Sequence, residues 1–156
     1  MKTLLAAAFV AVAGVAAQST PNLSGTWTLD AAKSDPPPAA PAGGRGRGNP
    51  NQMVITQTPA EITIALGFNN NYIYNLDGSE RTGPPGGETK SRIAWEGGKL
   101  VVTWKREYFA GPEQGYLTST GKDTYVMDGN VLTAERTTVQ GSQPPQTRRT
   151  VYTRTP

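Results

Sequence analysis

Most of the sequence after residue 50 alternates between apolar and polar residues, and short turn signals separate the alternating segments. At 61–66, for example, Ile62, Ile64 and Leu66 share one side and alternate with Glu61, Thr63 and Ala65. A period of two is that of a β-strand, whose successive side chains point to opposite faces. No segment after residue 18 has a capped apolar stripe of helical period, and we expect at most one helical turn, at 31–33. The chain is therefore predicted to be all-β.

The alternation predicts about nine strands, at 24–30, 53–57, 61–66, 71–76, 89–95, 99–109, 116–127, 130–138 and 148–154. Glu96-Gly97-Gly98 and Asp128-Gly129 are hairpin signals. Connections this short leave no room for helical crossovers, so we expect an antiparallel meander. A long meander hides its edges by closing, which predicts a barrel of about eight or nine strands. A two-sheet β-sandwich is the alternative.

The first 17 residues have the features of a secretory signal peptide. A single Lys2 precedes an apolar run at 4–15 that is too short to span a bilayer, and small residues follow it before Gln18. We therefore expect a secreted or periplasmic protein with no membrane anchor in the mature chain, in which 18–156 form a single domain. Within that domain, 36–51 is rich in Pro and Gly and has no large apolar residue, which predicts a flexible loop.

The composition argues against several chemistries. The sequence has no His and no Cys, which excludes Ser-His-Asp and Cys-His catalysis, the usual zinc sites and disulfides. The net charge of +3 is too small to indicate nucleic-acid binding. Asp77-Gly78-Ser79-Glu80 has the first ligands of a calcium loop but lacks the rest, and an Asp-Gly turn is favoured. We expect no cofactor and no metal, and we favour a binding protein over an enzyme.

The predicted meander places alternate connections at the same end of the barrel. The tight turns at 97–98 and 128–129 fall at one end, together with the long connection 33–51. The connections 77–88, 110–115 and 139–147 fall at the other end, and long polar loops commonly carry binding residues. This end is the predicted ligand-binding mouth, and the alternative is that its loops are only solvated connectors. The candidate ligand-binding residues on it are Arg81, Glu88, Phe109, Glu113 and Tyr116, with Gln114, Gln140 and Gln143 on the same rim.

The interior of such a barrel is either filled by side chains or holds one small ligand. The chain has a modest number of large apolar residues, so a filled or shallow interior is at least as strongly favoured as a large cavity. Aromatic residues recur in the predicted strands and could form a ligand platform, but at period two they more often belong to the core. They are Trp27, Trp95, Trp104, Tyr72 and Tyr74.

Gly25-Thr26-Trp27, at the start of the first strand, resembles the Gly-x-Trp motif of lipocalins. The resemblance implies a structural motif of Gly25, Trp27 and Leu29, with Trp27 packed at the closed end of the barrel. It also implies that an arginine of the last strand lies over Trp27. The candidates are Arg148, Arg149 and Arg154.

The chain also resembles small secreted bacterial β-domain proteins of unassigned function that open with Leu-Ser-Gly-Thr-Trp followed by Lys-Ser. These residues are 23–27 and Lys33-Ser34 here. This resemblance implies an extracytoplasmic, lipocalin-like domain and no known activity. We expect a binding protein for a small apolar or amphipathic ligand; the alternative is a structural or protein-interaction domain of the cell envelope. The oligomeric state stays open.

Overall fold

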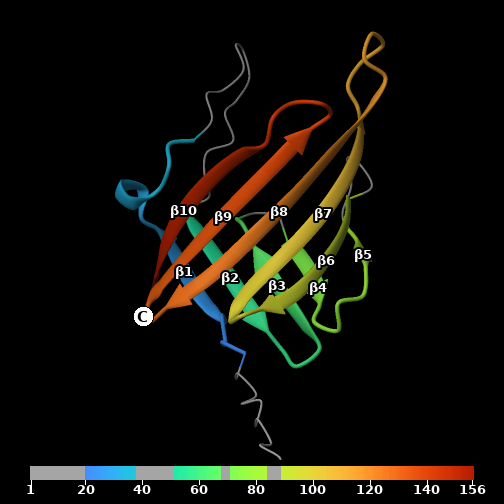
Figure 1. Cartoon of the computed structure of the whole chain (residues 1–156). Helices are drawn as coiled ribbons and strands as arrows, with labels where there is room; N and C mark the ends of the chain where they lie inside the picture. Colours follow the sequence, from blue (N-terminus) through green and yellow to red (C-terminus); the bar gives the residue numbers. More distant parts are fainter. Residues whose placement is uncertain (1–19, 38–50, 68–70, 84–88) are drawn as a thin grey trace, which may run out of the picture.

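The computed structural model describes residues 20–37, 51–67, 71–83 and 89–156, which form one β-sheet curled into a nearly closed barrel (Figure 1). All strand pairs are antiparallel, so the predicted meander is confirmed, and the single sheet decides for a barrel over a sandwich. The strands are β1 (Gly25–Leu29), β2 (Gln52–Gln57), β3 (Glu61–Ala65), β4 (Asn71–Asn75), β5 (Arg81–Thr82), β6 (Thr89–Glu96), β7 (Lys99–Phe109), β8 (Tyr116–Asp128), β9 (Val131–Gln140) and β10 (Gln146–Arg154).

The first and last strands of the described chain close the barrel. β1 pairs with β2 on one side and with β10 on the other, so the strand order is β4-β3-β2-β1-β10-β9-β8-β7-β6-β5. The two remaining edges belong to β4 and β5, and β4 approaches both β5 and β6. Closure therefore leaves little free edge for another strand to pair with.

The two-residue strand β5 changes which connections share an end of the barrel. The turn after β4 lies beside the β2–β3 turn, because the backbone N–H of Leu76 donates to the carbonyl oxygen of Ala60 at 2.8 Å. β5 then carries the chain back before β6 begins. The nine expected strands are all present, and β5 is a further strand among the described residues. It was not expected because a strand of two residues is too short to show alternation.

We call the two ends of the barrel the turn end, with the turns at 58–60, 97–98 and 129–130, and the loop end, with the loops at 110–115 and 141–145. β1 runs toward the loop end, since Trp27 pairs with Arg154 and Leu29 with Tyr152 of the antiparallel β10. The long connection after β1 therefore leaves from the loop end, not from the turn end as expected. The turn at 77–80 lies at the turn end, also contrary to expectation; there Asp77 Oδ1 accepts from the Ser79 N–H at 2.8 Å, which confirms the favoured turn.

Trp27 fills the turn end of the barrel and is fully buried. Its indole N–H donates to the Leu23 carbonyl oxygen at 3.0 Å, and the guanidinium of Arg154 lies 4.6 Å from its ring centroid. Arg154 is thus the arginine of the last strand that covers Trp27. Gly25, at a φ of +146°, lies against the same arginine, since a Cβ there would be 3.6 Å from Arg154 Nε. The core around Trp27 includes Met53, Ile55, Ile62, Ile64, Leu100, Val102 and Leu132.

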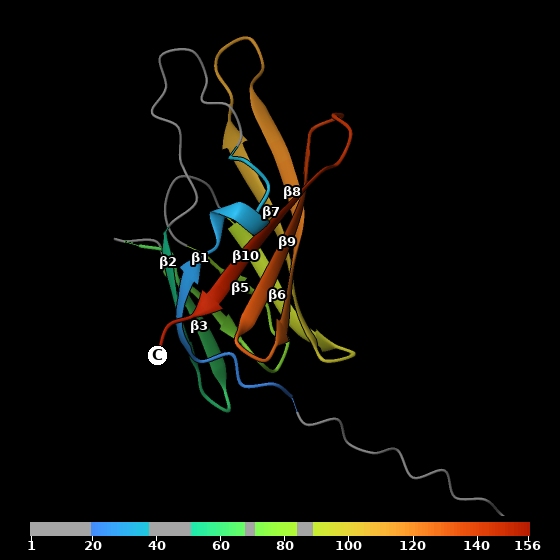
Figure 2. The same ribbon diagram turned by 90° about the vertical axis from the view of Figure 1, so that its left-hand side faces the viewer.

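The segment 30–35 follows β1 and still lies beside β10, although it is not part of a strand. It makes one 3-10 turn, η1 (Ala31–Lys33), as expected, and Figure 2 shows this turn beside β10. Ser34 Oγ donates to the Asp30 carbonyl oxygen at 2.7 Å and accepts from the Val151 N–H at 2.9 Å. Asp35 Oδ2 accepts from the Arg149 N–H at 2.7 Å. Ser34 and Asp35 therefore supply hydrogen-bond partners to the backbone of β10 beyond the end of β1.

Among the described residues, no helix is long and apolar enough to cross a membrane. The predicted signal peptide at 1–17 and most of the predicted loop at 36–51 lie outside the described residues.

Candidate functional site

The inner face of the barrel changes from apolar to polar toward the loop end. On β7, Leu100 and Val102 are fully buried, and Trp104 follows them on the same face, only partly buried. On β8, Tyr125 lies opposite Leu100, and Asp123 lies opposite Val102. The alternation of each strand thus places charged side chains directly above the hydrophobic core.

Asp123 and Arg136 form a two-point ion pair across adjacent strands β8 and β9. Arg136 Nε donates to Asp123 Oδ1 at 2.7 Å, and Arg136 Nη2 donates to Oδ2 at 2.6 Å. The Asp123 side chain is 5% exposed, whereas that of Arg136 is 52% exposed, so the arginine reaches water through the open end. Burial alone would lower the pKa of Arg136, but the hydrogen bonds and negative charge of Asp123 outweigh it and raise the pKa. The positive charge of Arg136 is therefore held against the Asp123 carboxylate, and the two side chains form an ion pair.

Trp104 adds a weak third contact to this pair. Its indole N–H lies 3.4 Å from Asp123 Oδ1, at the long limit of a hydrogen bond. Its ring lies over Gly121, where a Cβ would overlap the ring atoms. Only glycine therefore lets Trp104 lie flat against β8.

A cavity of about 110 Å³ lies between the core and the loop end. Its inner wall is apolar and includes Met53 and Leu66, while its polar groups come from β8, β9 and β10. The lining residues are Met53, Leu66, Asp123, Tyr125, Ala134, Glu135, Arg136, Arg148, Thr150 and Tyr152. Glu135 is exposed and alternates with Ala134 and Arg136, which places its side chain on the outer face of β9.

Three tyrosines surround the base of the polar region. Burial raises the pKa of Tyr125 well above its ordinary value, and the nearby charge of Asp123 adds to the effect. Burial also raises the pKa of Tyr74 and of Tyr152, against the opposing positive charge of Arg136. These phenols are therefore neutral at pH 7, and each hydroxyl is a hydrogen-bond donor.

Arg148 is the second cation of the cavity and lies beside the ion pair, opposite Arg136 in the register of β9 and β10. Its Nη2 donates to the backbone carbonyl oxygen of Asp35 at 3.3 Å. Its Nε is buried and has no hydrogen-bond partner within the described parts of the chain. Within the same parts, no carboxylate lies within 4.0 Å of its guanidinium.

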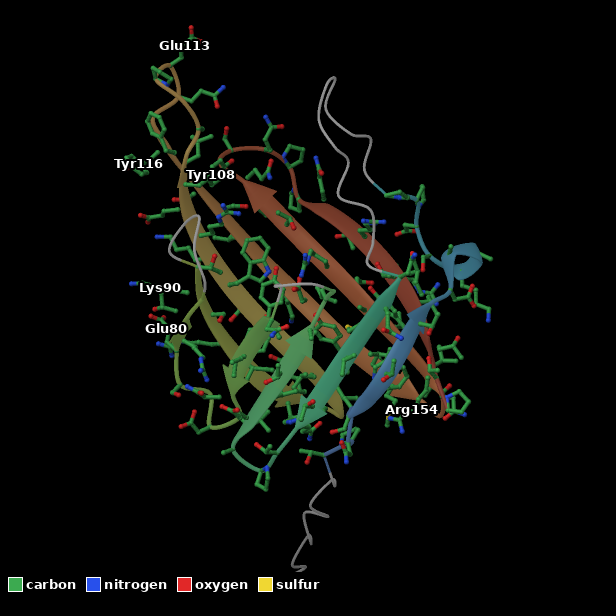
Figure 3. The ribbon with its side chains drawn as sticks, turned by 180° about the vertical axis from the view of Figure 1, so that it is seen from behind. Glu80, Lys90, Tyr108, Glu113, Tyr116 and Arg154 are labelled. Carbon is green, nitrogen blue, oxygen red and sulfur yellow. The ribbon has the colours of Figure 1, made fainter. Side chains whose placement is uncertain are left out.

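The predicted rim residues are not brought together into one site. Phe109 and Tyr116 face each other on the outside of the β7–β8 hairpin, with ring centroids 5.5 Å apart, and they are 59% and 79% exposed. Glu113 lies at the tip of the same hairpin, which projects beyond the barrel (Figure 3). Arg81 lies near the turn end instead, because its Nη1 donates to Asn75 Oδ1 at 3.1 Å and reaches Glu61 at 3.5 Å. Glu88 lies outside the described residues.

Sequence reasoning missed the inward-facing polar residues of the last three strands. Their signal was present: Asp123, Arg136 and Arg148 occupy positions in register with apolar residues on the same face of their strands. A charged residue at an inward position must be paired or must face a cavity. The prediction that the strand aromatics belong to the core is confirmed for Trp27 and Tyr74, which are buried. Tyr72, by contrast, is 37% exposed.

Comparisons of the chain with protein-family models, with curated proteins and with solved structures gave no match. Among the described residues, no three acidic side chains converge where they could hold a metal ion. The geometry of the barrel interior therefore carries the functional argument.

Proposed function

We propose that this chain is an extracytoplasmic, lipocalin-like binding protein that holds a small amphipathic ligand inside its barrel. The observation that carries the proposal is the cavity between the core and the loop end, with an apolar wall at Met53 and Leu66 and cationic groups at Arg136 and Arg148. Ligand sites commonly combine a mostly apolar lining with a few polar groups that fix orientation. The sequence features of residues 1–17 support the extracytoplasmic location.

The volume of the cavity limits the size of the ligand. An apolar cavity of about 150 Å³ holds benzene, which has six non-hydrogen atoms, so a cavity of about 110 Å³ accommodates about four or five in proportion. The half-exposed side chain of Arg136 indicates that the cavity communicates with water at the loop end. A longer ligand would therefore extend past Arg136 toward the loops.

Filling the cavity tests the proposal. Ala134 lines the cavity, and Ala134→Leu would place three more carbon atoms inside it. The matched control is Ala94→Leu, because Ala94 is an exposed residue of β6. With 1-pentanol as a neutral amphipathic probe, nuclear magnetic resonance titration should show saturable shifts at cavity residues in the wild type and in the control. Ala134→Leu should abolish them.

Two results would contradict the proposal. One is the absence of saturable binding of 1-pentanol, and of every other short amphipathic probe, to the folded wild type. The other is binding that survives Ala134→Leu unchanged, since that would place the ligand elsewhere on the molecule.

A further inference from the structure

We propose, on the basis of the binding function above, that the ligand is a short-chain carboxylic acid whose carboxylate is bound by Arg148. The two cations of the cavity differ in what they are free to bind. Arg136 already holds the Asp123 carboxylate through two short hydrogen bonds. Arg148 makes one long hydrogen bond, of 3.3 Å to the backbone oxygen of Asp35, and has no carboxylate partner among the described residues.

A comparison of the two buried arginine Nε atoms supports this assignment. Both Arg148 and Arg154 have a buried Nε without a hydrogen-bond partner in the described chain. In Arg154 the guanidinium stacks on the ring of Trp27, which compensates a buried cation. Arg148 has no such ring contact within the described parts of the chain, and it lines the cavity instead. A ligand anion in the cavity would supply the missing partner.

The neighbours of Arg148 suit a carboxylate with a short apolar tail. Tyr125 and Tyr152 line the same cavity, and neither hydroxyl makes a hydrogen bond to another described residue. Both can therefore donate to carboxylate oxygens, alongside the guanidinium. Met53 and Leu66 offer an apolar surface for the tail.

The negative charges nearby do not oppose this arrangement. Asp123 is neutralised by Arg136, and Glu135 occupies an outward position on β9. The cavity therefore carries one unneutralised positive charge among the described residues, that of Arg148. Hydrogen bonds between a guanidinium and a carboxylate are stronger than those between neutral groups.

The test compares probes of the same tail length but different charge. Isothermal titration of the wild type with pentanoate, 1-pentanol and pentylammonium should give the tightest binding for pentanoate, by about 10- to 100-fold over 1-pentanol. Pentylammonium should bind most weakly. Acetate, which lacks the tail, should bind more weakly than pentanoate.

A matched pair of variants assigns the effect to Arg148. Arg148→Met should reduce pentanoate affinity by about 10- to 100-fold and leave 1-pentanol affinity unchanged. The control, Arg149→Met, removes the neighbouring charge on the exposed, outward side of the same strand and should change neither. Circular dichroism of each variant checks that the barrel is folded.

The outcomes separate this inference from the proposed function. If 1-pentanol binds in the cavity as tightly as pentanoate, the binding function stands and the carboxylate assignment is overturned. The assignment also fails if pentylammonium binds as well as pentanoate, or if acetate binds as well, which would indicate a simple anion site. These wild-type comparisons hold even if Arg148→Met does not fold. Failure of all four probes would overturn both proposals.

Discussion

Removing either partner of the Asp123–Arg136 ion pair should lower the free energy of unfolding. The loss should be larger when Arg136 is removed than when Asp123 is. Arg136→Met leaves a carboxylate whose side chain is 5% exposed, with only the 3.4 Å contact to Trp104 Nε1 remaining. Loss of one partner from a buried ion pair costs about 3–5 kcal/mol. Asp123→Asn leaves Arg136, which is half exposed and can be hydrated, so we expect a cost of about 1–3 kcal/mol.

Urea denaturation and thermal unfolding would measure this difference. For a domain of this length each kcal/mol shifts Tm by about 2–4 °C, so Arg136→Met should lower Tm by about 6–20 °C. The double variant Asp123→Asn/Arg136→Met should be more stable than Arg136→Met alone, because no charge is left buried. The control is Lys122→Met, which removes an exposed partner of Glu96 at 3.6 Å and should change stability by less than about 0.5 kcal/mol.

The reasoning would be refuted if Asp123→Asn destabilised the protein as much as Arg136→Met. It would also be refuted if the double variant lost the sum of the two single effects, because the two groups would then act independently.

Two further predictions concern the aromatic residues. Trp27→Ala should destabilise the protein by about 3–5 kcal/mol in urea denaturation, because the fully buried ring and its stacking with Arg154 are both lost. A variant as stable as the wild type would show that Trp27 does not hold the turn end closed. Burial raises the pKa of Tyr74, Tyr125 and Tyr152 in the folded chain above the ordinary value of about 10. Above pH about 10 the unfolded chain therefore binds fewer protons than the folded chain, and stability should fall as pH rises. Tm measured against pH should show this fall, Tyr125→Phe should make it shallower, and a Tm that stays constant to pH about 11 would contradict it.

The strands of this barrel could be predicted because each one carries its own local pattern. The alternation in β3 and β7 and the turn signals at Gly97-Gly98 and Asp128-Gly129 depend only on neighbouring residues. The loops 110–115 and 141–145 share one end as expected, but the connections 33–51 and 77–80 were assigned to the wrong ends, because β5 has two residues and no detectable period. A single missed strand reverses the direction of every strand before it relative to those after it.

The candidate site depended on the tertiary structure for a different reason. The sequence shows that Asp123, Arg136 and Arg148 belong to alternating strands, but it does not show which residues lie opposite one another. Asp123 meets Arg136, and Arg136 meets Arg148, only through the registers of β8, β9 and β10. The predicted rim residues failed to converge because Phe109 and Tyr116 point outward from a hairpin that projects beyond the barrel.

The sequence by itself therefore determined the strands other than β5, the alternation of faces along each strand and the role of Trp27 as a buried core residue. The tertiary structure alone decided that β1 closes onto β10, that Arg154 rather than Arg148 covers Trp27, and that Arg148 is left facing the cavity. The physical reason is that alternation is a local property of one strand. Pairing, by contrast, depends on register and closure between strands that are distant in the sequence.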